Sequence, residues 1–113
     1  MEKKLVVLLL NRVDLLEDVL EGLLEIGVSG ATVLDSMGMA RVLSKDVPIF
    51  AGIRKAFPGL SPDNKTILIV TLEDKVPDIV AVIEDIVGDL TKPGAGLLFS
   101  LSIDGVWGLR PGL

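Results

Sequence analysis

The stretch KTILIVTLEDKVPDIVAVIEDIVG, residues 65–88, decides the fold. Residues 66–72 are an unbroken run of apolar and β-branched side chains, which is typical of a strand covered on both faces. A short polar turn follows at residues 73–75, and Pro77 then suits the first turn of a helix. Apolar residues recur from there at three- and four-residue intervals, which predicts a helix that ends at Gly88. The predicted buried stripe consists of Ile79, Val80, Val82, Ile83, Ile86 and Val87.

The beginning of the chain has the same order of elements. Residues 4–10 are an apolar run that predicts a strand, and the pattern from Val13 predicts an amphipathic helix ended by Gly27. Residues 31–37 then form a second strand, as residues 97–103 do in the second half. The apolar stripe of the first helix consists of Leu16, Val19, Leu20, Leu23 and Ile26, and we expect its acidic residues to form a solvated face.

Two β-α-β units therefore flank an insertion at residues 42–64. This order predicts a ferredoxin-like α+β fold, βαββαβ, with two helices on one face of a four-stranded antiparallel sheet. We expect a single domain over residues 1–113, with residues 42–64 as a projecting loop. The first and third strands are apolar on both sides, but the helices can cover only one side. Other copies of the chain are expected to cover the open side, so the protein should be an oligomer.

The composition excludes several classes of function. The 113 residues include no cysteine and no histidine, which excludes disulfides, histidine or cysteine nucleophilic catalysis and nearly all zinc sites. A net charge of −5 disfavours nucleic acid as a partner. The longest apolar runs fall far short of the ~20 residues that cross a bilayer. We therefore expect a cytoplasmic protein that is not an enzyme, inserts in no membrane and binds no metal.

Four short motifs are informative through their order and spacing. The first half contains Gly27-Val-Ser-Gly-Ala-Thr-Val33 and Met37-Gly-Met-Ala-Arg41, and the second contains Thr91-Lys-Pro-Gly-Ala-Gly-Leu97 and Val106-Trp-Gly-Leu-Arg110. Together they resemble the PII signal-transduction proteins, the trimeric nitrogen-regulatory sensors, over nearly the whole chain. The resemblance implies a homotrimer that binds adenine nucleotides, and in many members 2-oxoglutarate, in clefts between subunits. It also implies that the projecting loop contacts a regulated protein.

The same resemblance implies a ligand site built from three loops. The loop before the last strand supplies a lysine and two glycines, the base of the projecting loop a glycine and an arginine, and the C-terminal segment an arginine. These ligand-binding residues are Gly38, Arg41, Lys92, Gly94, Gly96 and Arg110. Without the resemblance, the glycines indicate a helix-to-strand turn, and the arginines indicate exposed charges that keep the surface soluble.

Four positions depart from the family's pattern. Leu97 stands where nucleotide-binding members carry a lysine, and Gly108 stands where they carry an arginine. Ala40 replaces a glycine, and Val42 replaces a glutamine that contacts ligand. Two cations that would neutralise phosphates in the family are absent, so the resemblance implies a less charged ligand than ATP, such as AMP or ADP or a different small molecule. The chain has no tyrosine, so the uridylylation known in some members has no acceptor here.

The insertion carries an apolar stripe at helical spacing, opened by Pro48 and closed by Pro58. This pattern predicts an amphipathic helix that docks on a regulated protein, such as a transporter or a metabolic enzyme. An anionic membrane surface and the protein's own trimer are the alternative docking surfaces. The expected partner-binding residues are Ile49, Phe50, Ile53, Arg54 and Phe57.

Two other functions share this fold class. One is an ACT-like small-molecule-binding module, which would place its ligand at helix–strand junctions and form dimers. The other is an acylphosphatase-like enzyme using Asn11 and Arg12, although no glycine-rich cradle surrounds them. Trp107 is expected either to anchor the core or to line a cleft.

Overall fold

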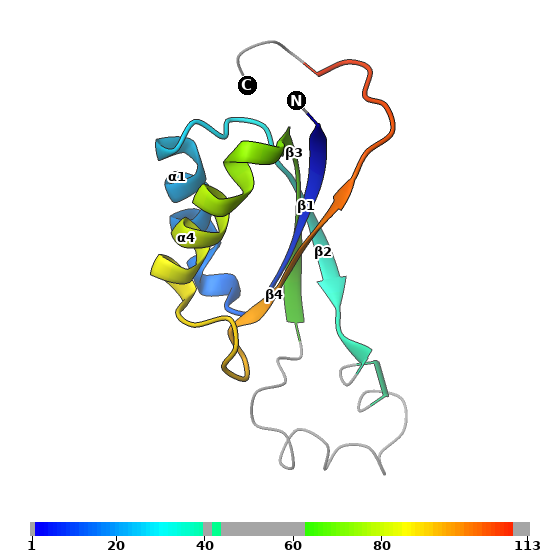
Figure 1. Ribbon diagram of the computed structural model, residues 1–113. Coiled ribbons are helices and arrows are strands. Elements are labelled where there is room, and N and C mark those ends of the chain that lie inside the picture. The colour runs from blue at the N-terminus through cyan, green and yellow to red at the C-terminus, as the bar shows by residue number, and fades with distance from the viewer. Residues whose placement is uncertain (1, 40–41, 44–62, 110–113) are drawn as a thin grey trace.

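The computed structural model describes residues 2–39, 42–43 and 63–109 (Figure 1). The described elements, in chain order, are β1 (Lys3–Leu10), the 3-10 turn η1 (Val13–Leu15), α1 (Leu16–Glu25), β2 (Thr32–Met37), β3 (Asp63–Leu72), the 3-10 turn η3 (Glu73–Lys75), α4 (Val76–Val87) and β4 (Gly96–Ser102). Each half is a strand, a short turn, a helix and a strand. The predicted βαββαβ order is confirmed.

The four strands form one antiparallel sheet in the order β2-β3-β1-β4. The two central strands, β1 and β3, pair over their length from Lys3 opposite Leu72 to Leu10 opposite Lys65. The two edge strands are the last strand of each half. Figure 1 shows α1 and α4 side by side on one face of this sheet. This is the ferredoxin-like arrangement expected from the sequence.

The core lies between the helices and the sheet. Alternate residues of the central strands point toward the helices, because successive side chains of a strand face opposite sides. Each helix contributes residues one turn apart, as the predicted stripes require. The buried core consists of Val6, Leu8, Leu10, Val19, Leu23, Val28, Ile67, Ile69, Ile79 and Ile83.

The helices begin and end as their sequences predict. Pro77 lies in the first turn of α4, and Gly88 caps its end with φ +94°. Gly27 adopts φ +95° just after α1, a conformation that favours glycine. Gly22 of α1 faces α4, since a Cβ there would stand 2.8 Å from side-chain carbons of Val82 and Ile86. The helix–helix contact therefore depends on the missing side chain.

Several strand boundaries differ from the prediction, and β1 and β2 begin one residue away from their predicted starts, at Lys3 and Thr32. β3 begins at Asp63 instead of residue 66, so the last two residues of the predicted loop 42–64 belong to a strand. The polar residues 63–65 join the strand because β2 pairs with them, with Met37 opposite Asp63. β4 spans residues 96–102, one residue earlier than predicted at each end.

The second face of the sheet is apolar and carries no described element. We call it the open face. Its central residue Val7 is only 8% exposed because neighbouring strands flank it, whereas Phe99 is 44% and Leu97 55% exposed on the edge strand. The pairing registers place these apolar residues on the open face: Leu5, Val7, Leu9, Leu34, Leu68, Val70, Leu97, Phe99 and Leu101. The expected uncovered apolar surface is confirmed.

Among the described residues, no helix combines the length and apolar character needed to cross a membrane.

Candidate functional site

The loop between α4 and β4, residues 89–96, is held by a turn around Asp89. The Asp89 carboxylate accepts hydrogen bonds from the hydroxyl of Thr91 at 2.7 Å and from its N–H at 2.9 Å. These bonds stabilise the charged form and lower the pKa of Asp89, the hydroxyl bond contributing most. The backbone N–H of Lys92 donates to the Asp89 carbonyl at 3.0 Å. The loop therefore presents Lys92 on an ordered turn, with its side chain exposed.

The glycines of this loop serve its geometry. Gly94 has φ +82° and Gly96 φ +138°, both in the region that favours glycine. A Cβ on Gly96 would also stand 2.6 Å from the carbonyl oxygen of Leu9 on the neighbouring strand. The turn interpretation therefore accounts for Gly96 by itself, and Lys92 is the residue of this loop whose chemistry suits an anion.

The described candidate residues lie at one end of the sheet but beside different edges. Gly38 follows β2, and its carbonyl accepts a hydrogen bond from the N–H of Val42 at 3.2 Å. Lys92, Gly94 and Gly96 precede β4 at the opposite edge. Three strand spacings separate the edges, so the two groups are at least about 14 Å apart in one chain. Arg41 and Arg110, and the partner residues Ile49, Phe50, Ile53, Arg54 and Phe57, lie outside the described residues.

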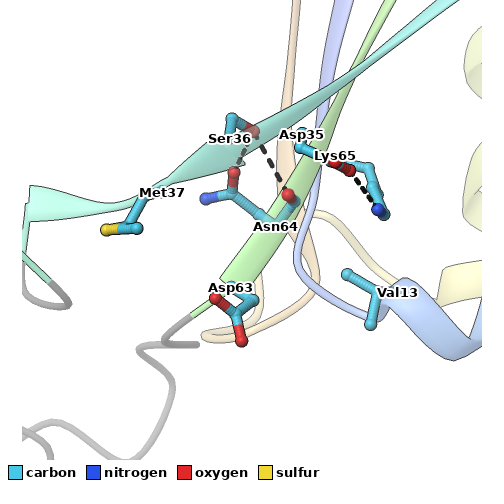
Figure 2. Close-up of a pocket in the computed structure, with 7 residues that line it drawn as sticks. All are labelled: Val13, Asp35, Ser36, Met37, Asp63, Asn64 and Lys65. Atoms are coloured by element: carbon cyan, nitrogen blue, oxygen red, sulfur yellow. Dashed lines mark hydrogen bonds and ion pairs between the residues drawn. The ribbon is translucent and has the colours of Figure 1, made fainter.

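A cavity of about 510 Å³ lies beside the end of β2. Figure 2 shows side chains from β2, β3 and η1 around it. The hydroxyl of Ser36 is directed at Asn64 and accepts from the Thr66 hydroxyl at 2.8 Å, and Lys65 pairs with Asp35. The lining residues are Val13, Asp35, Ser36, Met37, Asp63, Asn64 and Lys65.

No motif in the sequence points to this cavity. Its only signal is the polar run 63–65 directly before an apolar strand, and the predicted insertion includes residues 63 and 64 of that run. The lining contains two carboxylates and one ammonium group, so it suits hydroxyl or amide groups better than a phosphate. Met37 and Asp63 lie where the chain leaves the sheet for residues 42–62 and re-enters it. A molecule bound in this cavity would therefore contact the two strand ends between which residues 42–62 lie.

A smaller cavity of about 120 Å³ lies at the other end of the sheet. Lys75 and Leu109 are among its lining residues. The nearby Trp107 packs its ring over Gly105, where a Cβ would come within 2.7 Å of it. The indole is 91% exposed. Trp107 is therefore not a core anchor of its own chain.

Arg12 is already engaged with a carboxylate of its own turn. Its Nε donates to Asp14 at 3.0 Å and its Nη2 at 2.8 Å. This hydrogen bonding lowers the pKa of Asp14. These two hydrogen bonds occupy the edge of the guanidinium group that would have to bind an acyl phosphate. This pairing with Asp14 counts against the acylphosphatase alternative.

No protein-family model and no curated protein matches the chain. Solved structures do match it. The PII protein of Arabidopsis thaliana bound to citrate aligns with 99% of this chain and 84% of its own, at 22% identity and a TM-score of 0.67. B. subtilis GlnK aligns with 100% of this chain and 95% of its own, at 17% identity and a TM-score of 0.68. The GlnK–ATP complex aligns with 90% of this chain and 82% of its own, at 15% identity and a TM-score of 0.59.

A functionally unknown protein from Pediococcus pentosaceus is also similar, with a TM-score of 0.65 at 17% identity over 96% of this chain and 99% of its own. The similarity to PII structures extends along almost the entire chain, the described loop 89–96 included. At identities this low, what the chain shares with them is the fold. The chain therefore has a PII-like fold, as its motifs led us to expect.

Proposed function

We propose that this protein is a PII-like signal-transduction regulator and not an enzyme. It forms a homotrimer in the cytoplasm and binds a small anionic metabolite, an adenine nucleotide, in the clefts between subunits. Through residues 42–64 it controls a partner protein, such as a transporter or metabolic enzyme. The observation that carries this proposal is the open apolar face on a sheet with the PII-like fold.

The open face supports assembly. Monomeric proteins rarely expose contiguous apolar patches of this kind, and large ones mark interaction sites. Leu34, Leu97, Phe99 and Leu101 are each between 44% and 55% exposed in the single chain. Covering such side chains stabilises an assembly by about 25 cal/mol for each Å² of apolar surface removed from water. The number of three copies is what the family resemblance implies.

The loop 89–96 supports an anionic effector. It presents the exposed Lys92 ammonium on a turn that Asp89 and Thr91 hold in place. Two of the similar structures hold anions: the Arabidopsis protein is bound to citrate, and one GlnK structure is an ATP complex. Leu97 and Gly108 add no charge for further phosphates, so AMP or ADP is the preferred nucleotide here.

The cavity beside β2 supports control of the projecting segment. Its lining residues include Met37, the last residue of β2, and Asp63, the first residue of β3, and residues 42–62 lie between these two strands in the sequence. A ligand that binds one conformation of residues 42–62 more tightly than another shifts the equilibrium between the two conformations. The size of the shift is set by the difference between the two affinities. Ile49, Phe50, Ile53, Arg54 and Phe57 remain the predicted contacts for the partner protein.

Calorimetric titration with AMP, ADP and ATP tests the nucleotide part. We expect binding by the unaltered protein and about tenfold weaker binding by Lys92→Met, since one charge-assisted contact is lost. Lys3→Met is the matched control, because Lys3 begins β1 at the far end of the sheet. The absence of heat with all three nucleotides at millimolar concentration would remove the nucleotide from the proposal.

A further inference from the structure

The cavity beside the end of β2 has a charge preference opposite to that of the loop 89–96. Its described lining includes the carboxylates of Asp35 and Asp63, which outnumber the ammonium group of Lys65. We propose that this cavity is a second ligand site, which binds a small organic cation, a primary alkylammonium compound. This site goes beyond the proposed nucleotide cleft, since the excess of carboxylates repels a phosphate.

The charged part of the cavity lies on the helix side of the sheet. Side chains two residues apart on a strand share a face, and Lys65 stands two residues before the buried Ile67. Asp35 is paired opposite Lys65 and therefore lies on that face too. Figure 2 shows this pair on the side of the strands where Val13 of η1 approaches. The charged groups are therefore turned away from the open face.

The Asp35 carboxylate keeps capacity for a further hydrogen-bond donor. Lys65 donates to its Oδ1 atom, whereas a carboxylate accepts about four hydrogen bonds. The Asp35 side chain is 88% exposed, so a ligand can reach it from solvent. An ammonium group brings three N–H donors and a positive charge, whereas a hydroxyl group brings one donor and no charge. An ammonium group is therefore the better match for this wall.

The neutral polar groups of the lining are engaged with one another. The Ser36 hydroxyl donates to the side-chain oxygen of Asn64 and accepts from the Thr66 hydroxyl at 2.8 Å. This short chain of hydrogen bonds spans β2 and β3. The charge preference of the cavity is therefore set by its carboxylates.

The apolar part of the lining suits a short alkyl chain. Val13 and Met37 both line the cavity, and both are exposed. The volume of about 510 Å³ is within the range of small-molecule sites, about 300–1,000 Å³. An alkyl chain removes these two side chains from water while its ammonium end meets the carboxylates. A bare metal ion gains nothing from Val13 and Met37, which favours an organic cation.

NMR titration of the unaltered protein with butylammonium tests this inference. Butyrate and butan-1-ol are the matched probes, because they carry an alkyl chain of similar length with a negative charge or with none. We expect millimolar butylammonium to shift the amide signals of residues 35–37 and 63–65, and butyrate to leave them in place. Equal shifts with either matched probe show that the cavity does not select a positive charge, and they overturn the inference.

The outer faces of the helices provide a control for unspecific attraction of cations. α1 and α4 contain several carboxylates and no basic residue. At an ionic strength of about 0.15 M, salt screens exposed charges beyond about 8 Å. Under that condition the shifts should be confined to the cavity. Shifts of α1 and α4 amides as large as those of residues 35–37 overturn the inference.

Two substitutions should change the affinity for butylammonium in opposite directions. Asp63→Asn removes a carboxylate and should weaken binding about threefold, the effect of one partly exposed charge pair. Lys65→Met removes the competing ammonium group from Asp35 and should strengthen binding by a similar factor, which mere damage to the fold does not do. Weaker or unchanged binding by Lys65→Met overturns the inference.

Lys3→Met is the matched control for the loss of a positive charge. Lys3 pairs with Leu72 at one end of β1, whereas Lys65 pairs with Leu10 at the other end. This variant should bind butylammonium as the unaltered protein does. A gain in affinity equal to that of Lys65→Met would show that only the net charge of the protein matters, and it overturns the inference.

The outcome for this cavity is separable from the outcome of the nucleotide titration. A protein that binds AMP or ADP but not butylammonium keeps the proposed function and loses the second site. A protein that binds butylammonium in this cavity but no nucleotide keeps the cation site, and the nucleotide is removed from the proposed function.

Discussion

The ammonium group of Lys75 donates to the carbonyl oxygen of Ile26 across 2.6 Å. Lys75 belongs to the turn η3 before α4, and Ile26 caps the end of α1. The bond therefore ties the second half of the chain to the first. It also satisfies one of the carbonyls that a helix leaves unpaired at its C-terminus, where a positive charge is favourable.

Replacing Lys75 by methionine should lower the free energy of unfolding. Methionine keeps most of the side-chain volume but leaves the Ile26 carbonyl without its donor, which corresponds to about 1 kcal/mol for a half-buried hydrogen bond. Denaturant unfolding measures the change. Lys92→Met removes the same charge from an exposed loop position and should leave the unfolding free energy unaltered. Equal losses in the two variants would show that the bond contributes nothing specific.

Gly22→Ala should destabilise the contact between the two helices. The added Cβ would meet Val82 and Ile86 at 2.8 Å, and overpacking of this kind costs about 1–3 kcal/mol, more than alanine gains in helix propensity. Gly30→Ala is the control, because no atom lies within 4 Å of a Cβ there. Thermal unfolding should separate the variants clearly. A Gly22→Ala protein as stable as Gly30→Ala would mean that the helices can move apart freely.

The Asp89 carboxyl should titrate below the usual aspartate range. Its hydrogen bonds from Thr91 favour the charged form and lower its pKa, so this contribution to stability is present at neutral pH and is lost as pH falls through the lowered pKa. NMR titration of Thr91→Ala should show the pKa of Asp89 rising toward the ordinary value. Ser102→Ala should instead raise the pKa of Glu2, whose main lowering cause is Ser102, and leave Asp89 unchanged.

A charge on the open face should dissociate the assembly. Phe99→Asp places a carboxylate among apolar side chains that subunit contact would remove from water, and burying an unpaired charge is strongly unfavourable. Light scattering should show a fall to the mass of a single chain. Leu24→Asp makes the same kind of change at a residue of α1 that is 62% exposed, and it should leave the mass unaltered. An unchanged mass for Phe99→Asp would exclude the open face as the subunit contact.

Most of the fold could be predicted from apolar periodicity. The run 66–72 and the stripe that contains Ile79 and Ile83 identified a strand and an amphipathic helix, and the structure buries Ile67 and Ile69 of the strand against the helices. Gly27 and Gly88 marked the helix ends because only a positive φ lets the chain turn there. Local patterns of this kind depend on neighbours close in sequence, so the sequence alone exposes them.

The candidate site was less accessible to sequence reasoning. The cavity beside β2 depends on contacts such as Lys65 with Asp35 and Thr66 with Ser36, pairs separated by 30 residues. No local pattern records such a contact, and the polar residue 63 was assigned to a loop because hydrophobicity, not strand pairing, set the boundary. Gly96 is a different case: the family motif predicts it as a ligand residue, and its approach to the Leu9 carbonyl requires glycine there in any event.

The proposed assembly would make folding and abundance interdependent. Sister copies that shield Leu97, Phe99 and Leu101 would act as a ligand of the folded chain, so each increase in total concentration would raise the melting temperature by mass action. At low expression a larger share of the chains would be unassembled. Those chains would unfold at a lower temperature and be degraded by proteases, so the amount of protein would fall more steeply than its rate of synthesis. Gene dosage would therefore set a threshold for this protein, below which little of it persists.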